Sequence, residues 1–416
     1  MYILILLFFA GIAQAQMFDA RTISHAGVLD LSQRYSSTAL HGNPAILGPN
    51  AKQEPMTIEA LSFSAAAMNN AYSVSFWNDQ IARDHYLTTA DKRDIIDRLS
   101  GDELRVHANA AAPLAGMTYK QMAAAVSVES AINARAPKEL FELALYGNEL
   151  NRAYELKDFE GESYTMFNIA AGFSYKFEQE WIRELYGGIG FHFYQGIDYE
   201  KIVNADGELT VTDSLITGYT IVQRVHADYG DGVGFDIGGL AVFNDQWQLG
   251  ISLRQLGTSI SWDIQKSELK VWEADSAGII IDSLDDNDYL ERVFKTEDAE
   301  IAGGTYSSDL PVLIGFDSRF KATEKIILMG SMLIRTETSA QGDAGVEAGI
   351  ATEISARPWL PLHAGFSGGG SPGWQLGIGG GLRFKNYEMT LGWTWNRGLF
   401  NAARGISFGL SQQIRF

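Results

Sequence analysis

The 416-residue sequence carries a net charge of −19 and contains 43 Gly, 22 Phe, 17 Tyr and 9 Trp, but only 9 Pro and no Cys. Without cysteine the chain has no disulfide framework and no thiolate to bind a metal or act as a nucleophile. The negative charge argues against nucleic acid as a partner, because phosphate recognition requires a basic stripe. About 400 residues fit two or three ordinary domains or one large barrel, and the glycine and aromatic content favours the barrel.

The first residues have the pattern expected of an export signal. An apolar run at Tyr2–Ile12 is followed by Ala13-Gln14-Ala15, which has the small-x-small pattern of a cleavage site. The run is too short to cross a bilayer as a helix. We therefore expect residues 1–15 to be a signal peptide that is cleaved near Ala15, with an uncleaved anchor as the alternative.

Residues 16–55 show no strand pattern. They include the stretch Ser36–Gly48, in which small residues and the pair Asn43-Pro44 predict a compact turn. A segment placed before the first strand can sit inside a barrel. We expect residues 16–55 to form an internal hatch or plug, and residues 56–416 to form the barrel.

The N-terminal half of the predicted barrel is irregular. Thr57–Ala66 and Ala71–Trp77 are typical of a first hairpin, and Leu114–Tyr119 with Met122–Val128 of a second. Apolar residues at helical spacing predict short helical excursions at Thr89–Leu99 and Pro137–Leu145. We expect these helices to pack on a rim or inside the lumen.

From Leu310 onward, apolar and small or polar residues alternate almost continuously. Asn244-Asp245 and Lys385-Asn386 are turn signals that predict tight hairpins on one rim. The longer polar stretches 198–217 and 264–308 then become loops on the other rim. Short turns on one side and long loops on the other are typical of outer-membrane barrels, and the strong runs predict an all-β, antiparallel transmembrane barrel of about fourteen strands.

The last strand, Arg404–Phe416, has the same two faces. Ile406, Phe408, Leu410, Ile414 and Phe416 share the face that would contact outer-membrane lipid. A final amphipathic strand ending in an aromatic residue is typical of outer-membrane barrels. We expect Phe416 to serve as the signal read by the barrel-assembly machinery.

A family resemblance rests on three stretches of sequence. Ser36–Ala45, followed by an alternating chain, resembles the N-terminal hatch of the FadL-type fatty acid transporters and of their PorV-like relatives. Gly232–Gly257 and Leu140–Gly147 are similar to an uncharacterised FadL-like outer-membrane family. The resemblance implies a fourteen-stranded barrel with an internal hatch, in which Asn43, Pro44 and Ala45 occupy the hatch motif. It does not place any ligand-contacting residue outside the hatch.

The sequence contains no recognisable catalytic or metal-binding motif. Its seven histidines lack paired-ligand spacing, and no Gly-x-Ser-x-Gly elbow is present. We therefore expect no enzyme and no cofactor. His192 and His363 lie in predicted strands and would line the lumen, although a hydrolase with Ser and His on the outer wall is an alternative. The acidic stretch 275–300 lacks the spacing of a calcium loop and is interpreted as a solvated loop, with divalent ions left open.

Several charged residues fall on inward positions of the predicted strands. They are Arg335, Glu347, Glu353, Arg383 and Arg415. Opposite charges in a lumen can pair across it or set the selectivity of a pore, and pairing is the preferred interpretation.

One predicted strand is apolar on both faces. Ile327, Met329 and Leu333 face inward, opposite an apolar outward set. They predict either a hydrophobic pocket inside the barrel or the packing surface beneath the plug.

The function that best fits these features is passive transport of a hydrophobic or amphipathic small molecule through a monomeric outer-membrane barrel. A PorV-like partner that holds or shuttles secreted proteins is the second hypothesis. A structural barrel without transport is the third.

Overall fold

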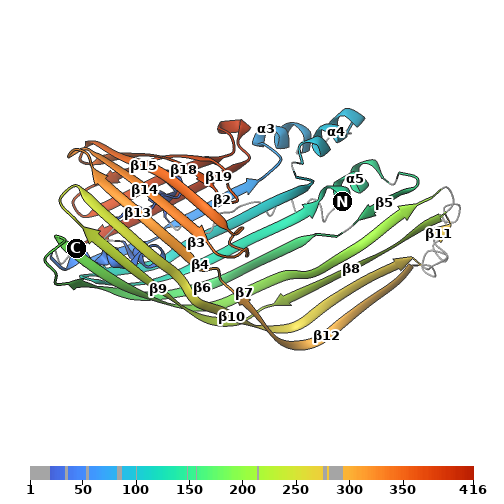
Figure 1. The fold of residues 1–416 in the computed structure, drawn as a ribbon, viewed down its shortest axis with the longest axis horizontal. Helices are drawn as coiled ribbons and strands as arrows, with labels where there is room; N and C mark the ends of the chain where they lie inside the picture. Colours follow the sequence, from blue (N-terminus) through green and yellow to red (C-terminus); the bar gives the residue numbers. More distant parts are fainter. Residues whose placement is uncertain are drawn as a thin grey trace.

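The computed structural model shows a closed barrel of fourteen antiparallel wall strands (Figure 1). The structure describes residues 19–32, 36–52, 56–81, 87–99, 101–147, 149–155, 157–212, 215–274, 279–280 and 294–416. The barrel closes because the first strand pairs with both the second and the last, with Thr57 opposite Arg415. Closure leaves no sheet edge exposed to lipid, as a spanning sheet requires. The predicted fold class is confirmed.

The first half of the described chain contains most of its helices. Its elements are α2 (Ala20–Ser24), η1 (Ser37–His41), η2 (Pro44–Lys52), β1 (Met56–Ala60), β2 (Phe63–Asn69), α3 (Val74–Phe76), η3 (Trp77–Ile81), α4 (Thr89–Asp97), β3 (Glu103–Tyr119), β4 (Met122–Pro137), α5 (Lys138–Tyr146), β5 (Arg152–Glu155), β6 (Glu160–Phe177) and β7 (Glu184–Val211).

The second half consists almost entirely of strands. Its elements are β8 (Leu215–Ala227), β9 (Gly230–Val242), β10 (Trp247–Ala274), β11 (Ile279–Ile280), β12 (Phe294–Asp309), β13 (Leu313–Lys321), β14 (Ile326–Arg335), β15 (Gly345–Arg357), β16 (Leu360–Gly369), β17 (Gln375–Arg383), β18 (Tyr387–Asn396), η5 (Phe400–Ala402) and β19 (Gly405–Arg415).

Three wall strands are interrupted. β1 and β2 form one strand that breaks at Leu61-Ser62, and both parts pair with β3 and β19. In the same way β8 continues into β9 along β7, and β12 continues into β13 along β10. Leu61 has a positive φ of 53° and is 79% exposed, so the break points a leucine outward from the wall.

Side chains alternate across the wall as the sequence predicts. On β18 the polar residues Glu388, Thr390 and Thr394 are buried inside, whereas Leu391 and Trp393 are exposed on the outside. The final strand β19 follows the same rule, with Ser407 inside and Phe408 outside. The outer face is therefore the apolar band of a lipid-facing barrel.

The two rims differ in the length of their connections. One rim carries the turns at 120–121, 178–183, 243–246, 322–325, 358–359 and 384–386, including the two predicted tight hairpins. The other rim carries connections that are mostly longer, at 70–102, 138–159, 336–344, 370–374 and 397–404. We call the first the short-turn rim and the second the long-loop rim.

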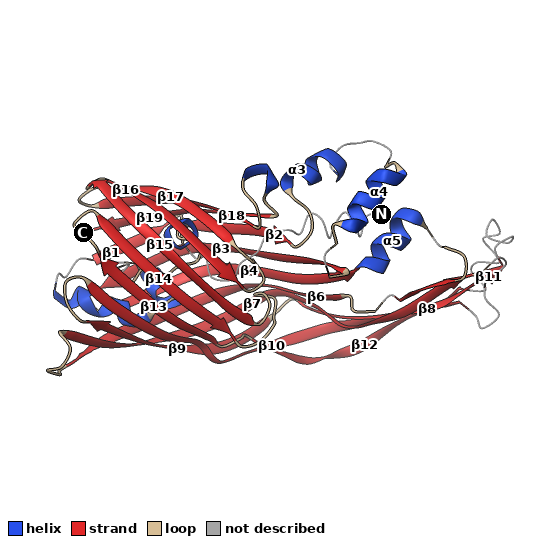
Figure 2. Cartoon of the chain, turned by 45° about the horizontal axis from the view of Figure 1, so that its top comes forward, coloured by secondary structure: helices blue, strands red, loops and turns tan. Residues whose placement is uncertain are grey.

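The predicted helices at 89–99 and 137–145 are confirmed as α4 and α5. α4 begins at a capping box between Thr88 and Asp91. Together with α3 they enclose a small apolar core at the long-loop rim, where Phe76, Ile96 and Phe141 pack against Leu104 on the outward face of β3 (Figure 2). The prediction of a strand at Ala71–Trp77 is wrong, because Ser73 caps α3 there.

Two predicted loops are also wrong. Most of 198–217 and the described parts of 264–308 are long strands, since β7, β8, β10 and β12 continue past the long-loop rim as a twisted extension (Figure 1). These stretches lack apolar alternation because they pair with each other beyond the barrel and have no lipid-facing side. Here β10 and β12 pair as a long hairpin, from Ser259 opposite Asp309 to Ala274 opposite Phe294.

Several predictions lie outside the described residues. These are the signal peptide at 1–15, the first part of the hatch segment and most of the acidic stretch 275–300. Among the residues that are described, no helix is both long and apolar enough to span a bilayer.

Candidate functional site in the barrel interior

The described N-terminal residues 19–32 and 36–52, here called the N-terminal segment, pack against the inner wall in the half of the barrel nearest the short-turn rim (Figure 2). They contribute a buried apolar cluster with the wall that includes Leu40, Ile46 and Leu240. The described residues of this segment therefore lie against the inner wall of the barrel.

The predicted motif Asn43-Pro44-Ala45 forms a close contact between the segment and the wall. The Asn43 side chain is fully buried and donates hydrogen bonds to the carbonyl oxygens of Gly239 and Ile251, both at 3.1 Å. Its Oδ1 accepts a hydrogen bond from the backbone N–H of Ala45 at 3.0 Å. Asn43 therefore joins the turn to β9 and β10 by its side chain alone.

Inward-facing glycines make this contact possible. A Cβ atom at Gly188 would overlap the backbone of Pro44 and Ala45, and one at Gly238 would overlap the Asn43 side chain. Only a residue without a side chain lets the turn approach the wall so closely.

Helix α2 rests on a second glycine surface at β16–β19. Cβ atoms at Gly365, Gly377 and Gly392 would collide with the backbone of the segment at residues 20–26. The N-terminal end of α2 is capped by Asp19, whose carboxylate accepts from two backbone N–H groups. In the sequence these glycines are only small residues on one face of a strand. In the structure they form the surface on which the N-terminal segment packs, here called its seat.

Charged residues connect α2 to the same strands. Arg21 pairs with Glu388 of β18 and lies 3.4 Å from Asp30 of the segment. Glu388 also accepts from Arg383 at 3.1 Å and from Arg415 at 2.6 Å. The carboxylates of Glu388 and Asp30 are buried, whereas Arg383 and Arg415 are partly exposed. The two carboxylates therefore depend on their arginine partners.

The inward charges predicted from the sequence are paired. Arg383 lies 3.1 Å from Glu353, and Arg335 lies 3.7 Å from Glu347. These contacts match the expectation of structural pairing. The sequence did not reveal Arg21 and Asp30 as members of the network, because they lie outside any strand pattern.

His363 and His192 line the interior, as predicted. His363 Nδ1 lies 3.0 Å from Ser24 Oγ, and its Nε2 lies 3.6 Å from Glu353. Ser, His and Glu in a row resemble a hydrolytic triad in composition. However, Ser24 Oγ donates its proton to the Arg21 carbonyl oxygen at 2.7 Å, and all three side chains are buried. The arrangement therefore fixes α2 to the wall and offers no accessible nucleophile.

A second polar group lies under η1. His192 lies 3.3 Å from Asp236 and 3.1 Å from Asn168, which donates to Glu129 at 2.7 Å. The His41 ring of the segment lies near the His192 ring in a tilted arrangement, with ring centroids 5.6 Å apart. Burial, with His192 and Arg254 nearby, lowers the pKa of His41 to about 3, so this histidine is neutral at neutral pH.

Above the N-terminal segment, the 336–344 connection folds inward. Ala340 and Gln341 are buried, and Gln341 Nε2 donates to the Tyr164 hydroxyl of β6 at 2.9 Å. Asn133 of β4 donates to the Ser339 carbonyl oxygen at 2.9 Å. Asp343 of the connection pairs with Arg135 at 2.9 Å. This inward connection narrows the lumen from the side opposite β4 and β6.

An aromatic cluster lies on the wall beside the inward connection. Trp262 of β10 is fully buried and stacks on Tyr199 of β7, with ring centroids 4.7 Å apart. Gly196 and Gly230 leave room for the indole, since a Cβ at either position would contact its ring. Tyr306 of β12 lies 5.7 Å from Tyr199 by ring centroids.

A cavity of about 550 Å³ opens next to this cluster at the long-loop rim. Its lining combines Tyr306 with Arg135 of β4, Glu162 of β6, Lys201 of β7 and Ser339 of the inward connection. Lys201 and Glu162 lie 3.4 Å apart. The cavity therefore offers an aromatic surface and charged groups within one space.

A second cavity of about 50 Å³ lies between the N-terminal segment and the wall. Its lining includes Arg21 and Glu388 of the charged cluster and Ser62 at the break in the first strand. Ser62 Oγ accepts from the backbone N–H of Gln412 at 3.1 Å, which replaces a ladder hydrogen bond at the break.

The inward apolar residues of β14 are divided between two environments. Met329 is buried and packs with Val28 of the N-terminal segment and Ala351 of β15, and Ile327 packs against this group. These two residues form the packing surface beneath the segment. Leu333 lies nearer the long-loop rim, opposite Gly315 and Glu347 in the register, and is half-buried.

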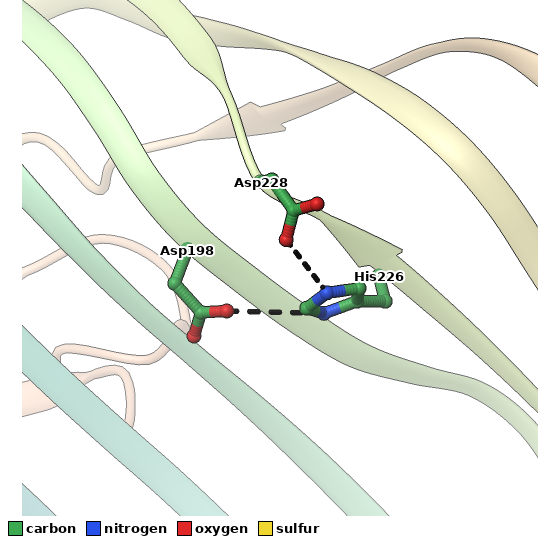
Figure 3. A group of neighbouring side chains, drawn as sticks. All are labelled: Asp198, His226 and Asp228. Atoms are coloured by element: carbon green, nitrogen blue, oxygen red, sulfur yellow. Dashed lines mark hydrogen bonds and ion pairs between the residues drawn. The ribbon is translucent and has the colours of Figure 1, made fainter.

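A separate ionisable group lies on the extension (Figure 3). His226 of β8 lies between Asp228, at 2.9 Å, and Asp198 of β7, at 3.8 Å. It is the one set of three neighbouring metal-ligand side chains found among the described residues. All three side chains are exposed, and each imidazole nitrogen faces a carboxylate. The contact at 2.9 Å is a hydrogen bond between His226 Nε2 and the Asp228 carboxylate.

The sequence profile of a protein family described as a family of unknown function (DUF5723) matches residues 56–392. The chain belongs to this family. The DUF5723 match covers the barrel from the first strand into β18. No curated protein matches the sequence.

Solved structures share the fold at low sequence identity. The DUF5723 chain is similar to the toluene transporter TbuX of Ralstonia pickettii, with a TM-score of 0.54 and 10% identity over 97% of this chain and 99% of that one. It is also similar to a FadL homologue of Pseudomonas aeruginosa, with a TM-score of 0.54 and 11% identity over 95% and 98% of the two chains. The toluene transporter TodX of P. putida aligns at a TM-score of 0.50 and 11% identity over 97% of both chains. These likenesses confirm the FadL-like fold that the resemblance implied.

Proposed function

We propose that this DUF5723 protein is an outer-membrane barrel that transports an amphipathic or hydrophobic small molecule. In this proposal its signal peptide is cleaved near Ala15 during export. The observation that carries the proposal is the division of the lumen. The N-terminal segment fills the half nearest the short-turn rim, while an aromatic and charged cavity of about 550 Å³ opens at the long-loop rim. A molecule of a few hundred Å³ fits the upper half, and the N-terminal segment controls its release.

The cavity lining favours an amphipathic cargo over a pure hydrocarbon. Tyr306 supplies an apolar surface, and Arg135, Lys201 and Glu162 supply charged groups that a hydrocarbon would leave without a partner. One of the similar structures is named a toluene transporter and another a FadL homologue. The first name corresponds to a hydrocarbon cargo and the second to an amphipathic fatty acid. In this proposal Asn43, Pro44 and Ala45 hold the hatch closed, and Phe416 directs assembly of the barrel.

Uptake in cells tests the proposal. Cells that express the barrel and cells that carry an empty vector would receive radiolabelled long-chain fatty acid or radiolabelled toluene. We expect faster uptake of the fatty acid in cells with the barrel, and a smaller effect for toluene. Equal fatty acid uptake in both cell types would remove the transport proposal.

A second candidate function rests on the extension of β7, β8, β10 and β12 (Figure 1). An ordered platform of strands beyond the rim is what a PorV-like partner for secreted proteins would present. Co-purification of secretion components with the full-length barrel would support this candidate. A purified barrel without such components would leave the transport proposal in place.

A further inference from the structure

The helical cap at the long-loop rim leaves a groove on the outside of the barrel. α3 and η3 stand away from β2 and β19, and a cavity of about 280 Å³ lies between them. We call it the rim groove, and its apolar lining consists of Ala67, Met68, Val74, Trp77, Leu104, Val106 and Ile406.

The floor of the rim groove belongs to the outer face of the wall. Ala67 and Ile406 are paired in the register, and Ile406 lies on the same face of β19 as the exposed Phe408. Leu104 and Val106 pair with Ala136 and Ala134 on β4. These positions continue the apolar band toward the long-loop rim.

The level of the groove coincides with an aromatic belt. Trp395 on β18 lies 5.0 Å from Phe400 of η5 by ring centroids, and Trp77 lines the groove itself. Aromatic belts mark the boundary between the hydrocarbon of a membrane and its headgroups. A belt at this rim would place the groove at the boundary between hydrocarbon and headgroups.

Positive charge lies at the headgroup end. Arg404 lines the groove, and its Nη1 donates to the Asn70 carbonyl oxygen at 2.7 Å, which fixes the guanidinium while leaving other donors available. Arg397 follows Asn396, whose carbonyl oxygen accepts a hydrogen bond from the Arg404 N–H at 2.9 Å, so the two arginines lie on neighbouring strand ends.

These charges are only partly compensated. Arg105 has carboxylate partners in Glu103 and Asp343. Within the described part of the chain, the side-chain hydrogen bonds of Arg397 and Arg404 go to backbone carbonyl oxygens, those of Pro372 and Ser371 for Arg397 and that of Asn70 for Arg404. Uncompensated guanidinium groups beside an apolar groove match an anion that carries an alkyl chain, since arginine binds phosphate through paired donors.

We propose that the rim groove binds an outer-leaflet lipid, with an acyl chain between η3 and the wall and a headgroup phosphate on Arg404 and Arg397. The proposal rests on the outer-membrane location given under Proposed function and is independent of the cargo. The bound lipid would fasten the helical cap to the barrel. It would also cover an apolar surface that otherwise faces the boundary between lipid and water.

The test uses full-length barrel purified in detergent and native mass spectrometry with diphosphoryl lipid A as the probe. Ala67→Trp fills the groove, and Ala65→Trp is the matched control, because Ala65 lies two residues along the same outward face and does not line the groove. We expect Ala67→Trp to reduce the lipid-bound fraction at least tenfold and Ala65→Trp to leave it unchanged. Heat-modifiable migration on gels confirms that each variant is folded.

A second pair of variants tests the charge. Arg404→Gln combined with Arg397→Gln should remove the preference for diphosphoryl over dephosphorylated lipid A, whereas Arg357→Gln at the short-turn rim should preserve it. Inorganic phosphate at millimolar concentration should not displace the lipid. Equal lipid binding by wild type and Ala67→Trp, or equal loss in both tryptophan variants, would overturn the proposal. Because binding is measured without cargo, its failure is distinguishable from a failure of uptake.

Discussion

The substitution Gly238→Ala tests the seat of the N-terminal segment. The new methyl group would overlap Asn43 Oδ1 and lie 3.0 Å from both the Ala45 nitrogen and the Pro44 Cδ. Asn43 cannot turn aside without losing its hydrogen bonds to Gly239 and Ile251. Gly239→Ala is the matched control, because its methyl group points outward and meets only Ile251 Cγ2, at 3.1 Å.

The expected magnitude follows from two effects. Overpacking of a tight contact costs about 1–3 kcal/mol. Loss of Asn43's hydrogen bonds adds about 0.5–1.5 kcal/mol for each bond. We expect the free energy of local opening of the segment to fall by about 3 kcal/mol in total, which corresponds to roughly 100-fold faster exchange at about 1.4 kcal/mol per tenfold.

Amide hydrogen exchange followed by mass spectrometry measures this effect across residues 19–32 and 36–52. Gly238→Ala should accelerate exchange in these peptides and leave the wall strands protected, whereas Gly239→Ala should behave as wild type. If Gly238→Ala leaves the segment fully protected, the seat described here does not hold it. Equal acceleration in both variants would show that the loss is a general defect of β9.

Three further predictions concern other parts of the molecule. Burial beside a second histidine lowers the pKa of His25 and of His41 to about 3, so the stability that is present above the unfolded pKa of 6.5 is lost as the pH falls toward 3. At pH 5 the N-terminal segment should have lost about 2 kcal/mol of stability for each histidine. Unchanged hydrogen exchange between pH 7 and pH 5 would contradict this. Tyr164→Phe removes the acceptor of the buried Gln341 amide, and exchange in residues 336–344 should reveal a loss of about 1–3 kcal/mol. Deletion of Phe416 should slow assembly, measured as the heat-modifiable fraction in isolated outer membranes, and normal assembly would remove its proposed role.

The wall strands could be predicted from the sequence because each strand's alternation depends only on its own residues. Each strand meets lipid on one side, so Leu391 and Trp393 alternate with residues that the lumen tolerates, and the period of two is visible in the letters. The same logic failed for β10 and β12 beyond the rim, since strands that pair outside the membrane have no lipid-facing side and therefore no alternation.

The interior was only partly predictable. Asn43-Pro44-Ala45 stood out as a turn, but its seat consists of glycines such as Gly188 and Gly238, which in a sequence resemble any small inward residue. Arg21 could not be linked to Glu388, because 367 positions separate them and no pattern relates a helix in the lumen to a distant strand. A run of glycines on inward positions of neighbouring strands is the signal that could have indicated a seated segment.

The central claim is that cargo passes only when the N-terminal segment leaves its seat, and an engineered disulfide tests it directly. A Cβ built at Gly349 lies 2.8 Å from Val28 Cγ2, which suits a disulfide between Val28→Cys and Gly349→Cys, and the chain has no other cysteine. We expect fatty acid uptake by the double variant to fall to the level of empty-vector cells when it is oxidised and to recover on reduction. The reduced double variant is the control, because a Cβ at Gly349 also lies 2.7 Å from Ser367 Cβ and Gly349→Cys therefore changes the wall by itself. Full uptake by the oxidised double variant would contradict the account.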